Sequence, residues 1–165
     1  MCQAILSNKP VSKPVKTLVL GLGNPILTDD GAGLAVAAKL KEMINREDVT
    51  VAQAELGGMN LLELFEGYDR AILIDAIVTP NGFPGTIYKL SPQSLTRCCN
   101  IESTHSLTFA DSLEVGRKLG MKLPTEIIIF AIEANDVTTF SEECSSLVKS
   151  AIPACVNRIA KLIQD

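Results

Sequence analysis

The chain has 165 residues, of which 47% are hydrophobic and 21% are charged, and its formal net charge is −4. These values are typical of one globular domain and exclude a largely disordered chain. With 15 basic against 19 acidic residues and only 4% aromatic residues, the chain offers neither a basic face nor stacking platforms for nucleic acid. Its apolar runs are shorter than the ~18–20 residues that a membrane-spanning helix needs.

The N-terminal segment and the cysteines bear on processing and compartment. Residues 1–16 (MCQAILSNKPVSKPVK) hold too short an apolar stretch for a signal peptide. We expect them to form a flexible leader before a single α/β domain over 17–165. The five cysteines are odd in number and lack Cys-x-x-Cys spacing, which predicts free thiols in a cytoplasmic protein.

Apolar runs alternate along the chain with stretches of helical periodicity. Strands are expected at 17–21, 49–54, 71–78, 85–90 and 125–134, and helices at 31–44, 60–65, 105–119 and 141–163. Ser141, followed by two glutamates, is the expected N-cap of the last helix. Near-continuous apolar strands separated by helices predict a mainly parallel sheet covered on both faces, with 85–90 as an antiparallel edge strand.

The segment 18–33 (LVLGLGNPILTDDGAG) runs from a buried strand through two glycines into a helix. Gly21 and Gly23 match the start of a dinucleotide fingerprint, but Ile26 stands at the third glycine position and no Gly-Lys-Ser/Thr follows. The pair Asp29 and Asp30 would repel a phosphate. One aspartate is explained as a helix N-cap, and the second indicates metal or proton chemistry.

Two further polar residues are expected at the same edge of the sheet. Asp75 interrupts the otherwise apolar strand 71–78, and burial of a carboxylate without a partner or metal costs several kcal/mol. His105, the only histidine, follows the edge strand. Two carboxylates and one imidazole with an open position suit Ni, Fe, Zn or Mn. We therefore expect Asp30, Asp75 and His105 to meet at the carboxyl edge.

The residues alone leave other interpretations open. Asp75 is also compatible with capping the backbone amides of a neighbouring loop. Ser103 and Ser106 flank His105, but neither lies in a Gly-x-Ser-x-Gly turn, which makes serine catalysis a weak alternative. A non-catalytic nucleotide-binding module would use the two glycines for phosphate and Glu55 for a ribose. A peptidase or amidase with its own tightly held metal is a third alternative.

Four segments, taken together, resemble the hydrogenase maturation endopeptidases. They are GLGNPILTDDGAG, GMNLLELFEGYDRAILIDAIV, PGTIYKL and the STHSL segment, in an order and spacing more specific than any one motif. The resemblance spans about 17 to 163. These enzymes are nickel-dependent proteases that trim the C-terminus of the [NiFe]-hydrogenase large subunit. The resemblance implies a three-layer α/β/α sandwich, in agreement with the pattern of strands and helices.

The resemblance also implies a set of site residues and a partner. Asp30, Asp75 and His105 correspond to the family's metal ligands, and Asp30 and Asp75 to its catalytic carboxylates. The nickel is expected to come with the hydrogenase precursor, which is the protein partner, rather than to be tightly held. Water would attack the peptide, with Asp30 or Asp75 as general base. A monomer that binds no nucleic acid and does not insert into a membrane is expected.

The chain departs from the family pattern after the second strand. Many relatives carry Asp-Gly-Gly-Thr-x-Gly where this chain reads QAELGG at 53–58. The resemblance implies that this loop contacts the substrate through Gln53, Glu55, Gly57 and Gly58. The difference suggests that the partner belongs to a different group of hydrogenases, and it leaves the expected metal ligands unchanged.

Overall fold

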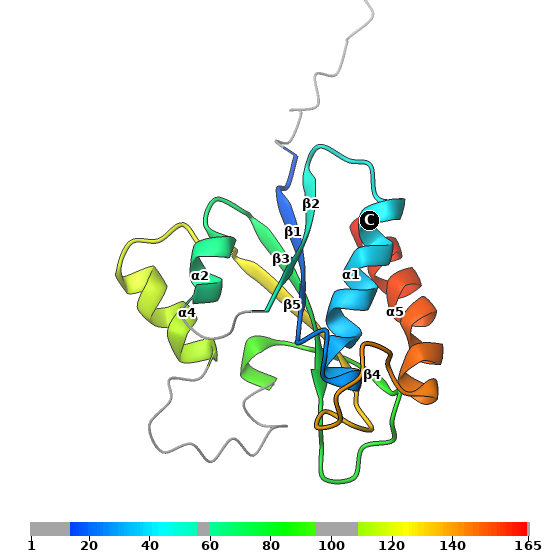
Figure 1. Cartoon of the computed structure of the whole chain (residues 1–165). Helices are drawn as coiled ribbons and strands as arrows, with labels where there is room; N and C mark the ends of the chain where they lie inside the picture. The colour runs from blue at the N-terminus through cyan, green and yellow to red at the C-terminus, as the bar shows by residue number, and fades with distance from the viewer. Residues whose placement is uncertain (1–13, 56–59, 95–108, 165) are drawn as a thin grey trace, which may run out of the picture.

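The computed structural model describes residues 14–55, 60–94 and 109–164 of the chain (Figure 1). Most of the predicted leader, and residues 105–108 of the predicted helix 105–119, lie outside these ranges. The leader and the domain boundary at 17 therefore remain predictions. None of the described helices is long and apolar enough to cross a membrane.

Five described strands form one sheet in the order β2-β1-β3-β5-β4. The strands are β1 (Thr17–Leu22), β2 (Val49–Ala54), β3 (Arg70–Ile77), β4 (Ile87–Leu90) and β5 (Glu126–Glu133). The pairs β1–β2, β1–β3 and β3–β5 are parallel, whereas β4 pairs antiparallel with β5 at the edge. The predicted mainly parallel sheet with one antiparallel edge strand is confirmed.

Helices cover both faces of this sheet (Figure 1). One face carries α1 (Ala32–Met43) and α5 (Ser146–Gln164), and the other carries α2 (Asn60–Phe65) and α4 (Phe109–Lys118). Alternate strand residues point to opposite faces. Val19 accordingly packs in the core with α1 and α5, while Leu18 and Leu20 pack in the core with α2 and α4. The α/β/α sandwich is confirmed.

The predicted start of the last helix is wrong. The helix α5 begins at Ser146, and Ser141 instead forms a parallel bridge with Leu27. Its amide donates to the carbonyl of Ile26 at 3.0 Å, and its carbonyl accepts from the amide of Thr28 at 2.9 Å. Ser141 therefore ties two distant loops together instead of capping a helix, because its backbone groups already have partners outside the helix.

The strand order creates a crevice position between β1 and β3. The chain leaves β1 for β2 on one side, while β3 lies on the other side of β1. In open parallel sheets, connections diverge at such a switch point and expose the carboxyl ends of the two strands. In Figure 1 the connections after β1, β3 and β5 gather at this carboxyl edge. The segments containing Asp30 and Asp75 are therefore at the place where ligands bind in folds of this kind.

Candidate active site

Two glycines let the loop after β1 and the helix α1 approach the sheet closely. Gly23 has a φ of +138°, and a side chain there would overlap the carbonyl of Asp30. A side chain on Gly33 would overlap the carbonyls of Leu22 and Ile74, which lie on β1 and β3. The space that glycine leaves is therefore filled by the chain's own backbone. This arrangement disfavours the reading of the loop as an open phosphate cradle.

The turn into the site is made by Thr28, the first residue of the short 3-10 helix η1 (Thr28–Gly31). Its φ of 46° is the left-handed conformation, which costs a non-glycine residue roughly 1–2 kcal/mol. The side-chain hydroxyl donates to the carbonyl of Thr139 at 2.6 Å, and this contact helps hold the turn. The strained turn directly precedes the two aspartates, as strained residues often do at functional sites.

Asp29 is completely buried and fully engaged with another part of the chain. Its Oδ1 accepts the Ser145 amide at 2.7 Å. Its Oδ2 accepts the amides of Asn135 and Asp136 at 2.8 and 2.9 Å and the Ser145 hydroxyl at 2.9 Å. These charge-assisted bonds satisfy the buried carboxylate. Asp29 thus fixes the segment between β5 and α5 against η1.

Asp30, the next residue, is only partly buried. Its Oδ2 accepts the amide of Asn24 at 2.9 Å and so closes the glycine loop. The prediction that one of the two aspartates is a helix N-cap is wrong. The N-cap positions of η1 and α1 are Leu27 and Gly31, and neither has a side-chain cap. The first amides of η1 bond instead to distant backbone carbonyls, those of Ser141 and Asp136.

Asp75 lies near the carboxyl end of β3, beside Asp30. The pKa of Asp75 is raised to about 6, mainly by burial and to a smaller degree by the Asp30 carboxylate, against a lowering by the amide of Ala76. That amide donates to Asp75 Oδ1 at 2.8 Å. Within the described residues, the carboxyl of Asp75 thus bonds to its own neighbour and not to a distant loop. Asp30 and Asp75 thus interact at one edge of the sheet, whereas their meeting with His105 and their roles in the site stay predictions.

The other predicted site residues are divided between described and undescribed segments. Gln53, near the end of β2, donates from Nε2 to the carbonyl of Leu34 at 2.7 Å. Glu55 follows β2 and is exposed. His105, Gly57 and Gly58 lie outside the described residues. In the described ranges, no group of three His, Cys, Asp or Glu side chains could hold a metal.

The sequence reasoning missed one buried acid. Glu133, at the carboxyl end of β5, is buried, and its Oε1 and Oε2 accept the amide and hydroxyl of Thr79 at 2.7 and 3.0 Å. Its carboxyl group lies directly against Gly82, where a side chain would overlap it. The available signal was a charged residue at the end of an apolar strand, which is the signal that singled out Asp75.

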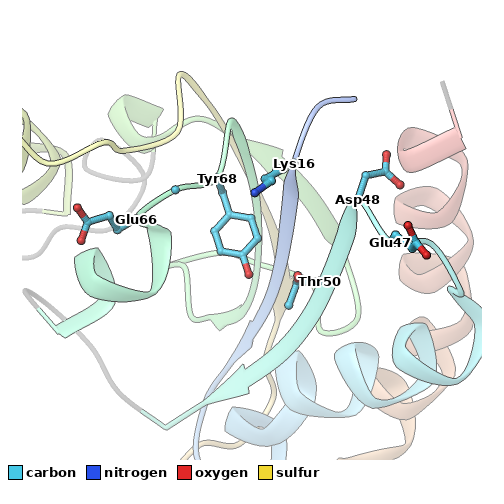
Figure 2. A pocket seen from close by; sticks show the side chains of 7 residues that line it. Lys16, Glu47, Asp48, Thr50, Glu66 and Tyr68 are labelled. Atoms are coloured by element: carbon cyan, nitrogen blue, oxygen red, sulfur yellow. The ribbon is translucent and has the colours of Figure 1, made fainter. Parts of the chain in front are cut away.

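A depression of about 330 Å³ lies at the opposite edge of the sheet (Figure 2). It is lined by Lys16, Glu47, Asp48, Thr50, Glu66, Gly67 and Tyr68. Lys16 and Asp48 directly precede β1 and β2, so the depression is at the amino edge, away from Asp30 and Asp75. Asp48 is already paired with Arg46 at 2.6 Å. We do not assign the active site to this depression.

Comparison with known proteins identifies the family. A family model described as hydrogenase maturation protease (HycI) matches residues 34–162. The hydrogenase 2 maturation protease of Escherichia coli (strain K12) is 31% identical over 120 residues, which cover 72% of this chain and 73% of that protein. The hydrogenase expression/formation protein HupD of Rhizobium leguminosarum bv. viciae is 25% identical, covering 91% and 75%.

Solved structures agree with this assignment. The hydrogenase maturating endopeptidase HybD from E. coli has a TM-score of 0.73 at 26% identity and covers 91% of this chain and 93% of that chain. The [NiFe] hydrogenase maturation protease HycI from Thermococcus kodakarensis KOD1 shares the fold, with a TM-score of 0.71, 22% identity and coverage of 93% and 96%. The chain therefore belongs to the hydrogenase maturation protease family.

Proposed function

We propose that this endopeptidase removes the C-terminal extension of a [NiFe]-hydrogenase large-subunit precursor after nickel has been inserted. The observation that carries the proposal is the proximity of Asp30 and Asp75 at the switch point of a chain that belongs to the maturation protease family. Asp30 follows β1 and Asp75 lies near the carboxyl end of β3, on the two sides of the switch point where ligands bind in folds of this kind.

The proposal assigns the metal to the substrate. Nickel bound in the precursor would be recognised by Asp30, Asp75 and His105, which supply two carboxylate oxygens and one imidazole nitrogen. This donor set suits a borderline divalent ion, and three ligands leave positions for the precursor's own ligands. Recognition of bound nickel would make cleavage depend on prior metal insertion. The same residues thereby act as a check on the maturation state of the precursor.

Hydrolysis requires a group that takes a proton from the attacking water. Asp30 and Asp75 are the two candidates, because their carboxylates lie at the proposed site and interact with each other. Asp30 is partly exposed and already accepts the Asn24 amide, which orients its carboxyl group. Asp75 is oriented by the Ala76 amide in the same way. Both carboxylates are thus held in position before substrate binds.

The loop after β2 completes the proposed site. Gln53, Glu55, Gly57 and Gly58 are proposed to contact the peptide, because β2 ends at the same edge of the sheet as β1 and β3. The amide of Gln53 bonds to the first turn of α1 through the carbonyl of Leu34, which holds the start of this loop beside the site. We further propose that the enzyme acts as a monomer in the cytoplasm.

The decisive experiment uses the precursor that accumulates when the gene for this protein is deleted. Purified protein should shorten the nickel-loaded precursor and leave the nickel-free form intact, as measured by mass spectrometry. His105→Ala should abolish cleavage without a change in melting temperature, because it removes one metal contact. Ser106→Ala is the matched control and should cleave normally. Equal cleavage by His105→Ala, or of nickel-free precursor, would contradict the proposal.

Metal analysis separates this proposal from a protease with a resident metal. Protein purified without chelator should contain far less than one equivalent of nickel, zinc or iron, because the nickel is expected to arrive with the precursor. A stoichiometric metal that remains bound through gel filtration would favour the resident-metal alternative. Activity that survives dialysis against a chelator, with nickel-loaded precursor as substrate, would favour recognition of the substrate's nickel.

A further inference from the structure

Four exposed apolar side chains stand on the segments around the two carboxylates. We call Ile26, Phe83, Phe140 and Leu147 the apolar rim. Phe83 and Phe140 are 70% and 79% exposed, whereas Phe65 and Phe130 lie in the cores. Large exposed aromatic side chains are costly to leave in water, and on a folded surface they commonly mark protein contact sites.

Two members of the apolar rim are neighbours across a backbone bridge. Leu27 pairs with Ser141 in parallel, and the carbonyl of Ile26 accepts the amide of Ser141 at 3.0 Å. In a parallel bridge the residues that precede the two partners also lie side by side, which places Ile26 next to Phe140. The segment containing Ile26 leads directly into η1 and Asp30. This half of the apolar rim thus borders the candidate active site.

The other two members are brought together at the start of α5. A side chain on Gly85 would lie 2.8 Å from the carbonyl of Leu147, so the two backbones are already in contact. Phe83 precedes this contact by two residues, and its carbonyl accepts the amide of Thr86 at 3.0 Å. The loop that contains Phe83 therefore packs against the start of α5, which contains Leu147. In Figure 1 the β3–β4 connection and the first turn of α5 both lie at the carboxyl edge.

Phe83 and Phe140 each lie in a loop whose two ends are held by one buried acidic residue. Asp29 accepts amides from Asn135, Asp136 and Ser145, which bracket Phe140. Asp29 in this loop, like Glu133 in the loop described next, therefore holds a loop in place. Preorganised loops lose less conformational entropy on binding, which strengthens an interface.

The second closed loop is built in the same way. The carboxylate of Glu133 accepts the amide and hydroxyl of Thr79, and its backbone bonds to Gly85 and Thr86 at 2.8 Å each. These contacts bracket Phe83. The β3–β4 loop is therefore anchored at its beginning and its end, and its exposed aromatic residue is held in place rather than free to collapse onto the sheet.

The charges near the apolar rim indicate which partner it fits. Glu142 and Glu143 are exposed between Phe140 and Leu147, and Lys149 is paired with Glu143 at 2.9 Å. Acidic side chains at this position repel the phosphates of nucleic acid and anionic lipid. An apolar protein surface with basic residues at its border is complementary in both respects.

We propose that the apolar rim is the docking surface for the folded body of the precursor protein whose tail enters the site. The inference rests on the proposed function, and it adds that affinity comes from the apolar rim and not only from the metal and the scissile segment. An endopeptidase must bring its protein substrate over Asp30 and Asp75, and the segments that contain the apolar rim lie at that edge. Docking there would present the tail to the two carboxylates.

The test compares Phe83→Ser, Phe140→Ser and the double variant with Leu119→Ser. Leu119 is a matched control, because it is 72% exposed but follows α4, before β5 begins at the amino edge. The probe is the nickel-loaded precursor that accumulates in the deletion strain. Each rim variant should raise the Kd and KM at least about tenfold, as expected for an aromatic anchor, with kcat unchanged at saturation. Leu119→Ser should match the wild type.

The outcomes distinguish this inference from the proposed function. If the wild type cleaves the precursor and the double variant has an unchanged Kd and KM, the docking inference is wrong although the proposed function stands. If the wild type neither binds nor cleaves the precursor, the proposed function fails. If sedimentation shows a wild-type dimer that the double variant dissociates, with unchanged precursor affinity, the apolar rim joins two copies and the inference is overturned.

Discussion

At the scale of single residues, two adjacent aspartates have different environments, from which we infer different roles. The carboxylate of Asp29 is buried and accepts four hydrogen bonds from the segment that leads into α5. The carboxylate of Asp30 is partly exposed, accepts the Asn24 amide, and lies beside Asp75. A buried and fully bonded carboxylate contributes to stability, whereas a less enclosed one is available to a ligand.

This division predicts opposite effects of two matched substitutions. Asp29→Asn should lower the free energy of unfolding by roughly 2–4 kcal/mol, because an amide accepts through one oxygen and leaves buried donors unpaired. Asp30→Asn should change it by less than about 1 kcal/mol while abolishing precursor cleavage. Urea unfolding and the cleavage assay measure both. Equal destabilisation by the two variants would refute the assignment of the roles.

The raised pKa of Asp75 predicts how the stability of the metal-free protein depends on pH. Because burial raises the pKa from 3.8 to about 6, the folded state binds the proton more tightly than the unfolded state. This group's contribution to stability is therefore fully present below pH 4 and is lost as the pH rises to about 6. A rise of about two units in the pKa of Asp75 corresponds to at most about 3 kcal/mol of unfolding free energy.

Asp75→Asn isolates this effect, because the asparagine oxygen can still accept the Ala76 amide. The variant should be more stable than the wild type at pH 8, by up to about 3 kcal/mol, and the difference should vanish near pH 4. Denaturant unfolding at both pH values, with chelator present, measures the difference. A difference that is the same at pH 4 and pH 8 would show that Asp75 ionises normally in the folded state.

At the scale of elements, the packing of α1 positions the site. The backbone of α1 at Gly33 touches carbonyls of both β1 and β3, which lie on the two sides of the switch point. The same approach places η1 against the end of β3 and so brings Asp30 to Asp75. The loop glycines therefore serve the packing of the helix onto the sheet, and the resemblance to a nucleotide loop reflects the shared strand-to-helix turn.

Gly33→Ala tests this packing. The added methyl group would overlap two backbone carbonyls, which cannot rotate away, so we expect a loss of about 3 kcal/mol or more of unfolding free energy. Gly31→Ala is the control, because its methyl group would meet its nearest neighbours at 3.5 and 3.6 Å in a backbone conformation that alanine accepts. Its cost should stay below about 1 kcal/mol. Thermal and urea unfolding measure both variants, and equal losses of unfolding free energy would show that Gly33 is not needed for the packing of α1.

At the scale of the whole molecule, the fold was predictable and the links between loops were not. The apolar runs of β1, β3 and β5 predict a buried parallel sheet, because strands covered on both faces need apolar residues at every position. The misplaced start of α5 shows the limit. Ser141 and the two glutamates have the local pattern of a helix start, but pairing with Leu27, 114 positions away in the chain, decides the conformation.

The sequence by itself determined the class of fold, the candidate carboxylates and the edge of the sheet where they meet. These follow from local periodicity and from the rule that parallel strands end on one side. Only the tertiary structure decided which aspartate is structural, that Glu133 is a buried anchor, and that Phe83 and Phe140 stand exposed beside the site. The physical reason is that burial and hydrogen-bond partners depend on residues distant in sequence, which no local pattern records.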